Sequence, residues 1–164
     1  MLHLKKITPD GRMDIYLMLQ EIAPNDNGFH NKVCGMTFEQ YQEWLAQEYA
    51  VDSGMLEDWM VPQTSYWLYD GDTPVGYGRL RHYLNDALRA SSGHIGYAIR
   101  KSCRGRGYGN AILALLLEEC RKLSIHDVQI GANADNIPSN KVIMKNGGIL
   151  KRTENGKNFY RITL

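Results

Sequence analysis

The sequence predicts a single α/β (α+β) domain spanning residues 1–164, and three observations support this prediction. The 164 residues, 43% of them hydrophobic, suffice for one core but are too few for two ordinary domains. Strand-like and helix-like periodicities alternate along the chain. No repeat, linker or low-complexity tract separates them, so the elements are expected to pack together.

The N-terminal part predicts a strand followed by two helices. Residues 2–7 alternate between apolar and polar side chains, as a strand does. After Asp10-Gly11, four apolar residues recur on one helical face, namely Ile15, Met18, Leu19 and Ile22. The run 24–28 breaks this helix. Thr37, with Glu and Gln close behind it, forms a capping pattern that opens a second helix, which ends before 52–54.

A β-hairpin and a further strand are predicted next. Residues 65–69 and 75–83 flank Asp70-Gly71-Asp72, which is the turn chemistry of a hairpin. A turn-rich gap over 85–93 then leads to a strand over 94–99.

The C-terminal part predicts two helices among three strands. Apolar residues trace one face of a half-buried helix from Asn110 to about Leu123. Asn136 is a candidate N-cap just ahead of a proline, and Gly147-Gly148 ends that second helix. The strands are expected over 127–132, 149–153 and 159–164.

Composition excludes several classes of protein. With 19 Lys plus Arg against 18 Asp plus Glu, the net charge of +1 gives no field that would recruit nucleic acid or anionic lipid. The longest apolar run, 111–117, is far shorter than the roughly 20 residues of a membrane-spanning helix. The first residues lack a signal peptide's apolar region, and three dispersed cysteines fit reduced thiols, so a cytoplasmic protein is expected.

The segment 104–109, Arg-Gly-Arg-Gly-Tyr-Gly, is the most informative part of the chain. Its glycines let the backbone approach a ligand closely, and the free amides of a helix start point at the same place. The helix dipole, Arg104 and Arg106 add positive charge, so a pyrophosphate is a suitable ligand. The spacing fits neither a Walker loop nor a dinucleotide fingerprint. Taken alone, the segment could also be a tight turn with solvated arginines.

With its surroundings, this segment resembles motif A of the GCN5-related N-acetyltransferases (GNAT), whose three fixed positions are filled by Arg104, Gly107 and Gly109. The resemblance continues in Asn136-x-x-Ser139 and covers essentially the whole chain. It implies a mixed, mostly antiparallel sheet of six to seven strands flanked by about four helices. It also implies a splayed parallel strand pair, here 94–99 and 127–132, that binds acetyl-CoA.

The resemblance further implies which residues bind the coenzyme. Backbone groups around Tyr97, Ile99 and Lys101 would bond the pantetheine arm and polarise the thioester. Asn136 and Ser139 would lie against the coenzyme, although Asn136 could also be only a helix cap. The pyrophosphate would be held by the loop and helix start that contain Arg104, Gly105, Arg106, Gly107, Tyr108, Gly109 and Asn110.

The proton-transfer residues depart from the family pattern. Many members carry a carboxylate near the start of the strand before motif A, but this chain has Ser-Ser-Gly-His at 91–94. His94 is therefore the candidate base, with His82 as a weaker one, unless the strand turns His94 away from the cleft. The family's tyrosine acid falls on Ile143, so that role is vacant or moved. The substitutes are three tyrosines that could equally be packing residues, Tyr97, Tyr108 and Tyr160.

Two other groups of residues carry weaker hypotheses. His30 and Cys34 have zinc-like spacing but no second ligand pair, so no metal is expected. The aromatic and acidic segment 41–59 could line the acceptor site, or it could be an ordinary amphipathic helix with exposed charges.

The leading functional hypothesis is direct transfer of acetyl from acetyl-CoA to a primary amine of a small molecule or protein. No activated cysteine supports a covalent route. A non-catalytic acyl-CoA-binding or sensor domain is the alternative, because the usual carboxylate and tyrosine are missing. RNA binding through the Arg-Gly turn is disfavoured by the +1 charge. The oligomeric state stays open, with a homodimer as one option.

Overall fold

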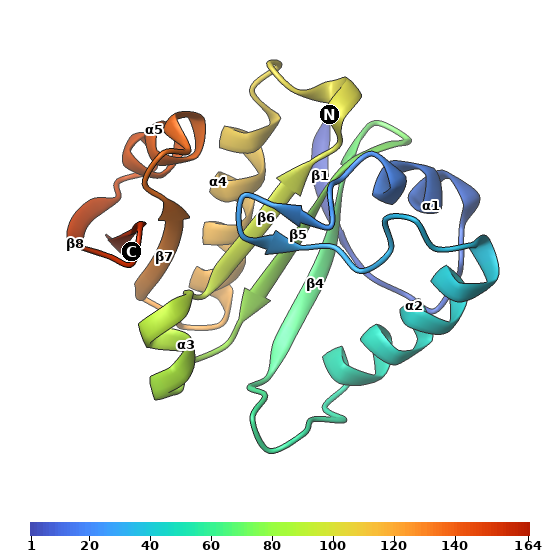
Figure 1. The fold of residues 1–164 in the computed structure, drawn as a ribbon, viewed down its shortest axis with the longest axis horizontal. Helices are drawn as coiled ribbons and strands as arrows, with labels where there is room; N and C mark the ends of the chain where they lie inside the picture. The colour runs from blue at the N-terminus through green and yellow to red at the C-terminus, as the bar shows by residue number, and fades with distance from the viewer.

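A computed structural model describes residues 1–164, and its main strands form two hydrogen-bonded sheets (Figure 1). All pairings within both sheets are antiparallel. The first sheet has the order β1-β4-β5-β6, with β1 Leu2–Lys6, β4 Gln63–Asp70, β5 Thr73–Arg81 and β6 Ile95–Ile99. The second has the order β7-β9-β8, with β7 Asp127–Asn133, β8 Ile149–Glu154 and β9 Lys157–Thr163.

Helices cover both faces of the first sheet. On one face lie the two amphipathic N-terminal helices, α1 Met13–Gln20 and α2 Phe38–Asp52, and the predicted capping box at Thr37 is present. On the other face lies α4, Tyr108–Lys122, while α5, Ile137–Lys145, lies beside the second sheet (Figure 1). Each face has its own buried core. None of the helices has the length and apolarity needed to cross a membrane.

A short helix, a short hairpin and a 3₁₀ turn were missing from the sequence prediction. The segment 85–93, expected as a gap, contains the helix α3, Asp86–Ser91, which Asn85 caps. The run 24–28, expected only as a helix breaker, folds as a hairpin of β2 Asn25–Asp26 and β3 Phe29–His30. Its turn residues, Asn27 and Gly28, both have positive φ, and Asn-Gly suits such a turn. A 3₁₀ turn, η1 Lys101–Cys103, also follows β6.

The predicted splayed strand pair is present between β6 and β7. The two strands point the same way in Figure 1 and are connected through α4. At one end they touch, because the His94 amide donates to the Gln129 carbonyl at 2.8 Å. A Cβ on Gly93 would lie 2.4 Å from the same carbonyl, so only glycine allows this approach. Beyond this point no backbone hydrogen bond joins the strands, and they diverge.

Candidate active site

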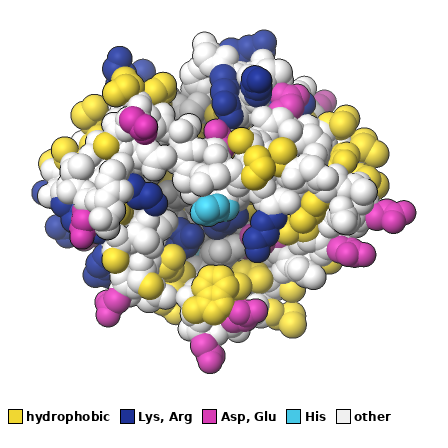
Figure 2. Space-filling model, in the orientation of Figure 1, with side chains coloured by type: hydrophobic (Ala, Val, Ile, Leu, Met, Phe, Trp, Pro, Cys, Tyr) yellow, Lys and Arg dark blue, Asp and Glu magenta, His cyan; other side chains and the backbone are white.

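A cavity of about 760 Å³ opens where β6 and β7 diverge. Figure 2 shows it as a hollow near the centre of one face, with Lys and Arg side chains around it. Its lining includes most of the residues that the sequence assigned to the coenzyme, namely Tyr97, Ile99, Arg104, Gly105, Gly107, Tyr108, Gly109, Asn110, Asn136 and Ser139. Two residues assigned to the coenzyme, Lys101 and Arg106, do not line it, and neither does the candidate base His94.

The loop before α4 presents a run of unpaired backbone amides to this cavity. No amide from Gly105 to Asn110 donates a hydrogen bond within the protein, and the N-cap, Gly107, has no side chain to satisfy any of them. Gly105 and Gly107 have φ of +79° and +82°, a backbone conformation that favours glycine. Amides of this kind at a helix N-terminus bind phosphate oxygens. The loop therefore has the geometry that a pyrophosphate requires.

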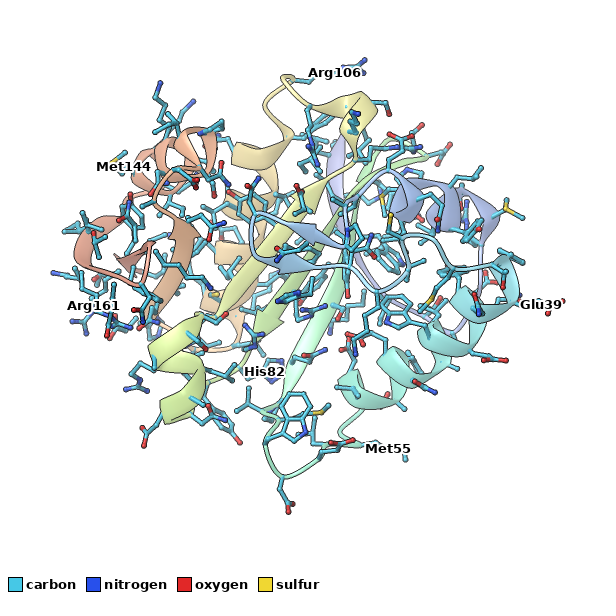
Figure 3. All side chains as sticks on the ribbon, viewed as in Figure 1. Glu39, Met55, His82, Arg106, Met144 and Arg161 are labelled. Carbon is cyan, nitrogen blue, oxygen red and sulfur yellow. The ribbon has the colours of Figure 1, made fainter.

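The two arginines of this loop differ. Arg104 donates to the Ile99 carbonyl at 3.1 Å and pairs with Asp26 at 3.0 Å, so it ties β2 to the end of β6. Arg106 is exposed and extends away from the fold (Figure 3). Of the two arginines expected to add positive charge at this loop, Arg104 lines the cavity and Arg106 does not.

Strand alternation identifies further backbone groups that face the gap. The Arg81 amide donates to the His94 carbonyl, and the Arg100 amide donates to Val75, so even-numbered residues of β6 bond β5. The backbone N–H and C=O groups of Ile95, Tyr97 and Ile99 then face β7. The Ile99 carbonyl accepts a hydrogen bond from Arg104, and the backbone groups of Ile95 and Tyr97 lie at the cavity.

His94 lies at the closed end of the strand pair. Its ring is buried, and Nδ1 accepts a hydrogen bond from the Gln129 amide at 3.0 Å. With Nδ1 as the acceptor, the neutral ring carries its proton on Nε2, so neither nitrogen is free to take another. Burial lowers the pKa of His94, which further disfavours the charged form. This geometry favours a structural role that joins β6 to β7 and weighs against the predicted role as base.

His82 does not line the cavity either. Its ring bonds the Thr64 hydroxyl at 2.8 Å, and Figure 3 places it beside the lower part of the first sheet. The one histidine in the lining is His30, which belongs to the unpredicted β2–β3 hairpin. The sequence carried no signal for this placement beyond the Asn-Gly turn, because the hairpin that carries His30 is distant in sequence from β5, β6, β7 and the loop before α4, which form the rest of the site.

Of the three tyrosines considered as acids, one has a free hydroxyl. Tyr108 donates to Asp70 at 2.5 Å, and Tyr160 donates to Asn140 at 2.6 Å. Tyr97 lines the cavity, and its buried hydroxyl makes no hydrogen bond. Ile143, where the family's tyrosine often stands, is fully buried in the core. Among these three tyrosines, Tyr97 on β6 is thus the one whose hydroxyl has no hydrogen-bond partner.

Two arginines of β5, Arg79 and Arg81, also line the cavity, and sequence reasoning missed both. They project from the face of β5 that packs against the β2–β3 hairpin, where the Arg79 guanidinium lies 5.3 Å from the Phe29 ring. Gly96 makes room for this ring, because a Cβ there would lie 3.2 Å from it. The hairpin thereby covers the part of the cavity beside β5.

The segment 41–59 does not line the cavity. Tyr41 and Trp44 are buried in the core between α2 and the sheet, as the amphipathic-helix alternative expected. Asp52 accepts hydrogen bonds from Gln63 and Ser65 and so fixes α2 to β4.

No group of three or more His, Cys, Asp or Glu side chains is placed to hold a metal ion. Asn136 caps α5, with its side chain 3.4 Å from the Ser139 amide, and also lines the cavity.

Comparison with known proteins agrees with this geometry. A family model described as an acetyltransferase (GNAT) domain matches residues 2–149, which is most of the chain. The chain belongs to this family. It is therefore an acyltransferase by descent, and the resemblance read from the 104–109 segment is confirmed. No curated protein sequence matches the chain.

Solved GNAT structures share the fold at low sequence identity. The microcin C7 self-immunity acetyltransferase MccE, in complex with acetyl-CoA and AMP, is 14% identical with a TM-score of 0.72, over 99% of this chain and 92% of that chain. The ribosomal-protein-S5-alanine acetyltransferase from Vibrio fischeri has the same identity, TM-score and coverage. RimL in complex with coenzyme A is 15% identical, with a TM-score of 0.70 over 99% and 94%. These similarities confirm the predicted fold class.

Proposed function

We propose that the protein transfers acetyl from acetyl-CoA directly to a primary amine. The observation that carries this proposal is the run of unpaired amides from Gly105 to Asn110 at the mouth of the cavity between β6 and β7. The pyrophosphate of the coenzyme fits these amides. The pantetheine arm fits the gap, where its own amides would replace the missing ladder between the strands. The thioester would then lie deeper in the cavity.

The chain offers groups for each part of the reaction. The amine nitrogen attacks the thioester carbon, and backbone amides of β6 that face the gap, such as that of Tyr97, stabilise the developing oxyanion. The C–S bond then breaks, and the Tyr97 hydroxyl supplies a proton to the departing thiolate. Burial raises the pKa of Tyr97, so the hydroxyl holds its proton at neutral pH until the thiolate leaves.

The base that takes the amine proton has two candidates. His94 is the residue that the sequence suggests, but its Nδ1 accepts a hydrogen bond from the Gln129 amide at the closed end of the strand pair, which leaves the ring proton on Nε2. His30 is exposed and lines the cavity. We propose His30 as the base, acting directly or through a water, and keep His94 as the alternative that mutation distinguishes.

Turnover of acetyl-CoA in the presence of a broad panel of primary amines tests the proposal. Free thiol should be released in step with the acetylated amine. A non-catalytic acyl-CoA-binding domain would instead bind acetyl-CoA without turnover of any amine, and that result would contradict enzymatic transfer. We also propose a cytoplasmic location, since all three cysteines are free.

A further inference from the structure

The part of the cavity beside β5 holds two arginines, Arg79 and Arg81, that lie outside the loop proposed to bind the pyrophosphate. Arg79 and Arg81 are two residues apart on one strand, so their side chains share a face of the sheet. Arg79 pairs with Gly96, and β6 continues to Ile99 before the phosphate loop begins. At about 3.3 Å per residue, Arg81 lies roughly 17 Å along the strands from the end of β6. A pyrophosphate on the loop is therefore remote from Arg81.

Arg81 is a cation without a carboxylate partner. One of its nitrogens donates to the Ser92 hydroxyl at 3.0 Å and the Gly93 carbonyl at 2.9 Å, both of which are neutral. Burial and the nearby charge of Arg79 lower the pKa of Arg81 to about 10, so it remains charged at neutral pH. A buried charge is costly unless an opposite charge or several hydrogen bonds compensate it.

No carboxylate supplies that compensation to Arg81, in contrast to its neighbour Arg79. Arg79 donates to the Tyr77 hydroxyl at 3.0 Å, and its Nε forms an ion pair with Glu48 at 3.9 Å, although this buried nitrogen makes no hydrogen bond. The only acidic residue in the cavity lining is Asp26, which Arg104 already holds. Arg81 is therefore the cation at this end of the cavity that has no acidic partner, and its recorded hydrogen bonds use only one of its nitrogens.

We propose that the acceptor is a primary amine that also carries an anionic group, a carboxylate or a phosphate, bound by Arg81 with help from Arg79. Planar guanidinium groups suit both anions, since they donate two parallel hydrogen bonds. The two cations also disfavour an ammonium beside them, which promotes the neutral amine that attacks the thioester. This inference rests on the proposed acetyl transfer, because it names the substrate class of the same site.

Matched amines test the proposal. β-Alanine is compared with β-alaninamide, and O-phosphoethanolamine with ethanolamine, by kcat/KM on the wild type, Arg81→Gln, Arg81→Lys and the surface control Arg12→Gln. We expect at least one anionic amine to exceed its neutral partner by about 10- to 100-fold, the scale of a charge-assisted hydrogen bond. Comparing the β-alanine pair with the O-phosphoethanolamine pair shows whether the site prefers a carboxylate or a phosphate. The preference should vanish in Arg81→Gln, partly return in Arg81→Lys, and persist in Arg12→Gln, with unchanged acetyl-CoA affinity throughout.

Neutral amines that match or exceed their anionic partners in the wild type would overturn the proposal while leaving acetyl transfer intact. If no amine is acetylated, the proposed function fails, and a binding measurement decides the anion site separately. Inorganic phosphate is titrated by calorimetry into protein saturated with coenzyme A, which occupies the loop. Binding that weakens about tenfold or more in Arg81→Gln but not in Arg12→Gln supports the site. Absent or equal phosphate binding refutes it.

Discussion

The two ends of the cavity are built from different parts of the polypeptide. The proposed coenzyme end consists of consecutive backbone amides, Gly105 to Asn110, from one loop and one helix start. The proposed acceptor end consists of side chains from separate segments, with His30 on the β2–β3 hairpin and Arg79 and Arg81 on β5. A site made of backbone amides tolerates changes of side chain, so it suits a group such as the coenzyme that every reaction of the family uses. A site made of side chains can be altered by single substitutions, so the acceptor that it binds can change while the coenzyme stays the same.

The largest expected effect concerns the base at the acceptor end. His30→Ala should lower kcat by about 10²- to 10⁴-fold, as loss of a general base does, with little change in acetyl-CoA affinity. His94→Ala should mainly lower the free energy of unfolding, by about 1–3 kcal/mol, because the Gln129 amide loses its buried acceptor. Steady-state kinetics and thermal unfolding of both variants separate these roles. If instead the His94→Ala variant is stably folded but slow, and the His30→Ala variant is fully active, then His94 and not His30 is the base.

This difference between the ends explains what could be predicted from the sequence. Positive φ at Gly105 and Gly107 demands glycine, so the coenzyme loop leaves a local pattern that can be read without a structure. His30, Arg79 and Arg81 meet only through β3·β6 and β5·β6 packing, and no spacing along the chain records that. The β2–β3 hairpin that carries His30 has only two-residue strands, which are too short for periodicity to reveal.

The same contrast applies to secondary structure. The sequence predicts the long hairpin of β4 and β5 because two strand-like runs, 65–69 and 75–83, flank the turn residues Asp70-Gly71-Asp72. It does not predict α3, because the six residues of this helix include no buried side chain and therefore show no apolar face. Only its cap at Asn85 signals a helix start, and the same residue type is common in turns. Elements without a buried face are the ones that sequence periodicity misses.

A substitution at the coenzyme end should have the next largest effect. Gly107→Val forces a β-branched residue into φ of +82° and displaces the amides around it. We expect acetyl-CoA affinity to fall about 100-fold or more, the cost of losing two charge-assisted hydrogen bonds. Calorimetry measures this loss. Gly54→Val is the matched control, since Gly54 also has positive φ (+103°) and open surroundings but lies outside the cavity. Equal affinity in Gly107→Val and wild type would contradict the assignment of this loop.

A smaller effect is expected at the contact that supports the coenzyme loop from α1. Glu21 bonds Arg100 at 2.5 Å and accepts from the Ser102 amide at 2.9 Å, just before the loop. The Arg100 guanidinium, with Ser102, lowers the pKa of Glu21 to about 2. Because the folded-state pKa lies below the usual 4.5, this stabilisation is present above pH 4.5 and is lost as pH falls towards 2.

Glu21→Gln should therefore lower the free energy of unfolding by roughly 1–2 kcal/mol at neutral pH, a value discounted for partial solvent exposure. The difference from wild type should shrink as the pH falls from 4.5 to 2. Denaturant unfolding at several pH values measures it. Glu118→Gln serves as the control, because Glu118 and its partner Arg121 are both largely exposed. If both variants lose the same free energy of unfolding at every pH, the contacts of Glu21 stabilise the fold no more than an exposed ion pair does.

The smallest effect is expected at Cys103. This thiol lines the cavity beside the coenzyme loop, and its recorded side-chain contact is with the Ser102 hydroxyl at 3.9 Å, so no base activates it. Cys103 also lies at the opposite end of β6 from Arg81, where the acceptor would bind. An acyl group passed to Cys103 would thus move away from the amine rather than towards it.

Cys103→Ala should keep wild-type kcat/KM within about twofold, since only direct transfer is expected. Mass spectrometry of the wild type quenched during turnover should find no acetylated cysteine. An S-acetyl group on Cys103 that forms and decays at the rate of turnover would overturn direct transfer and make the coenzyme end itself a site of chemistry.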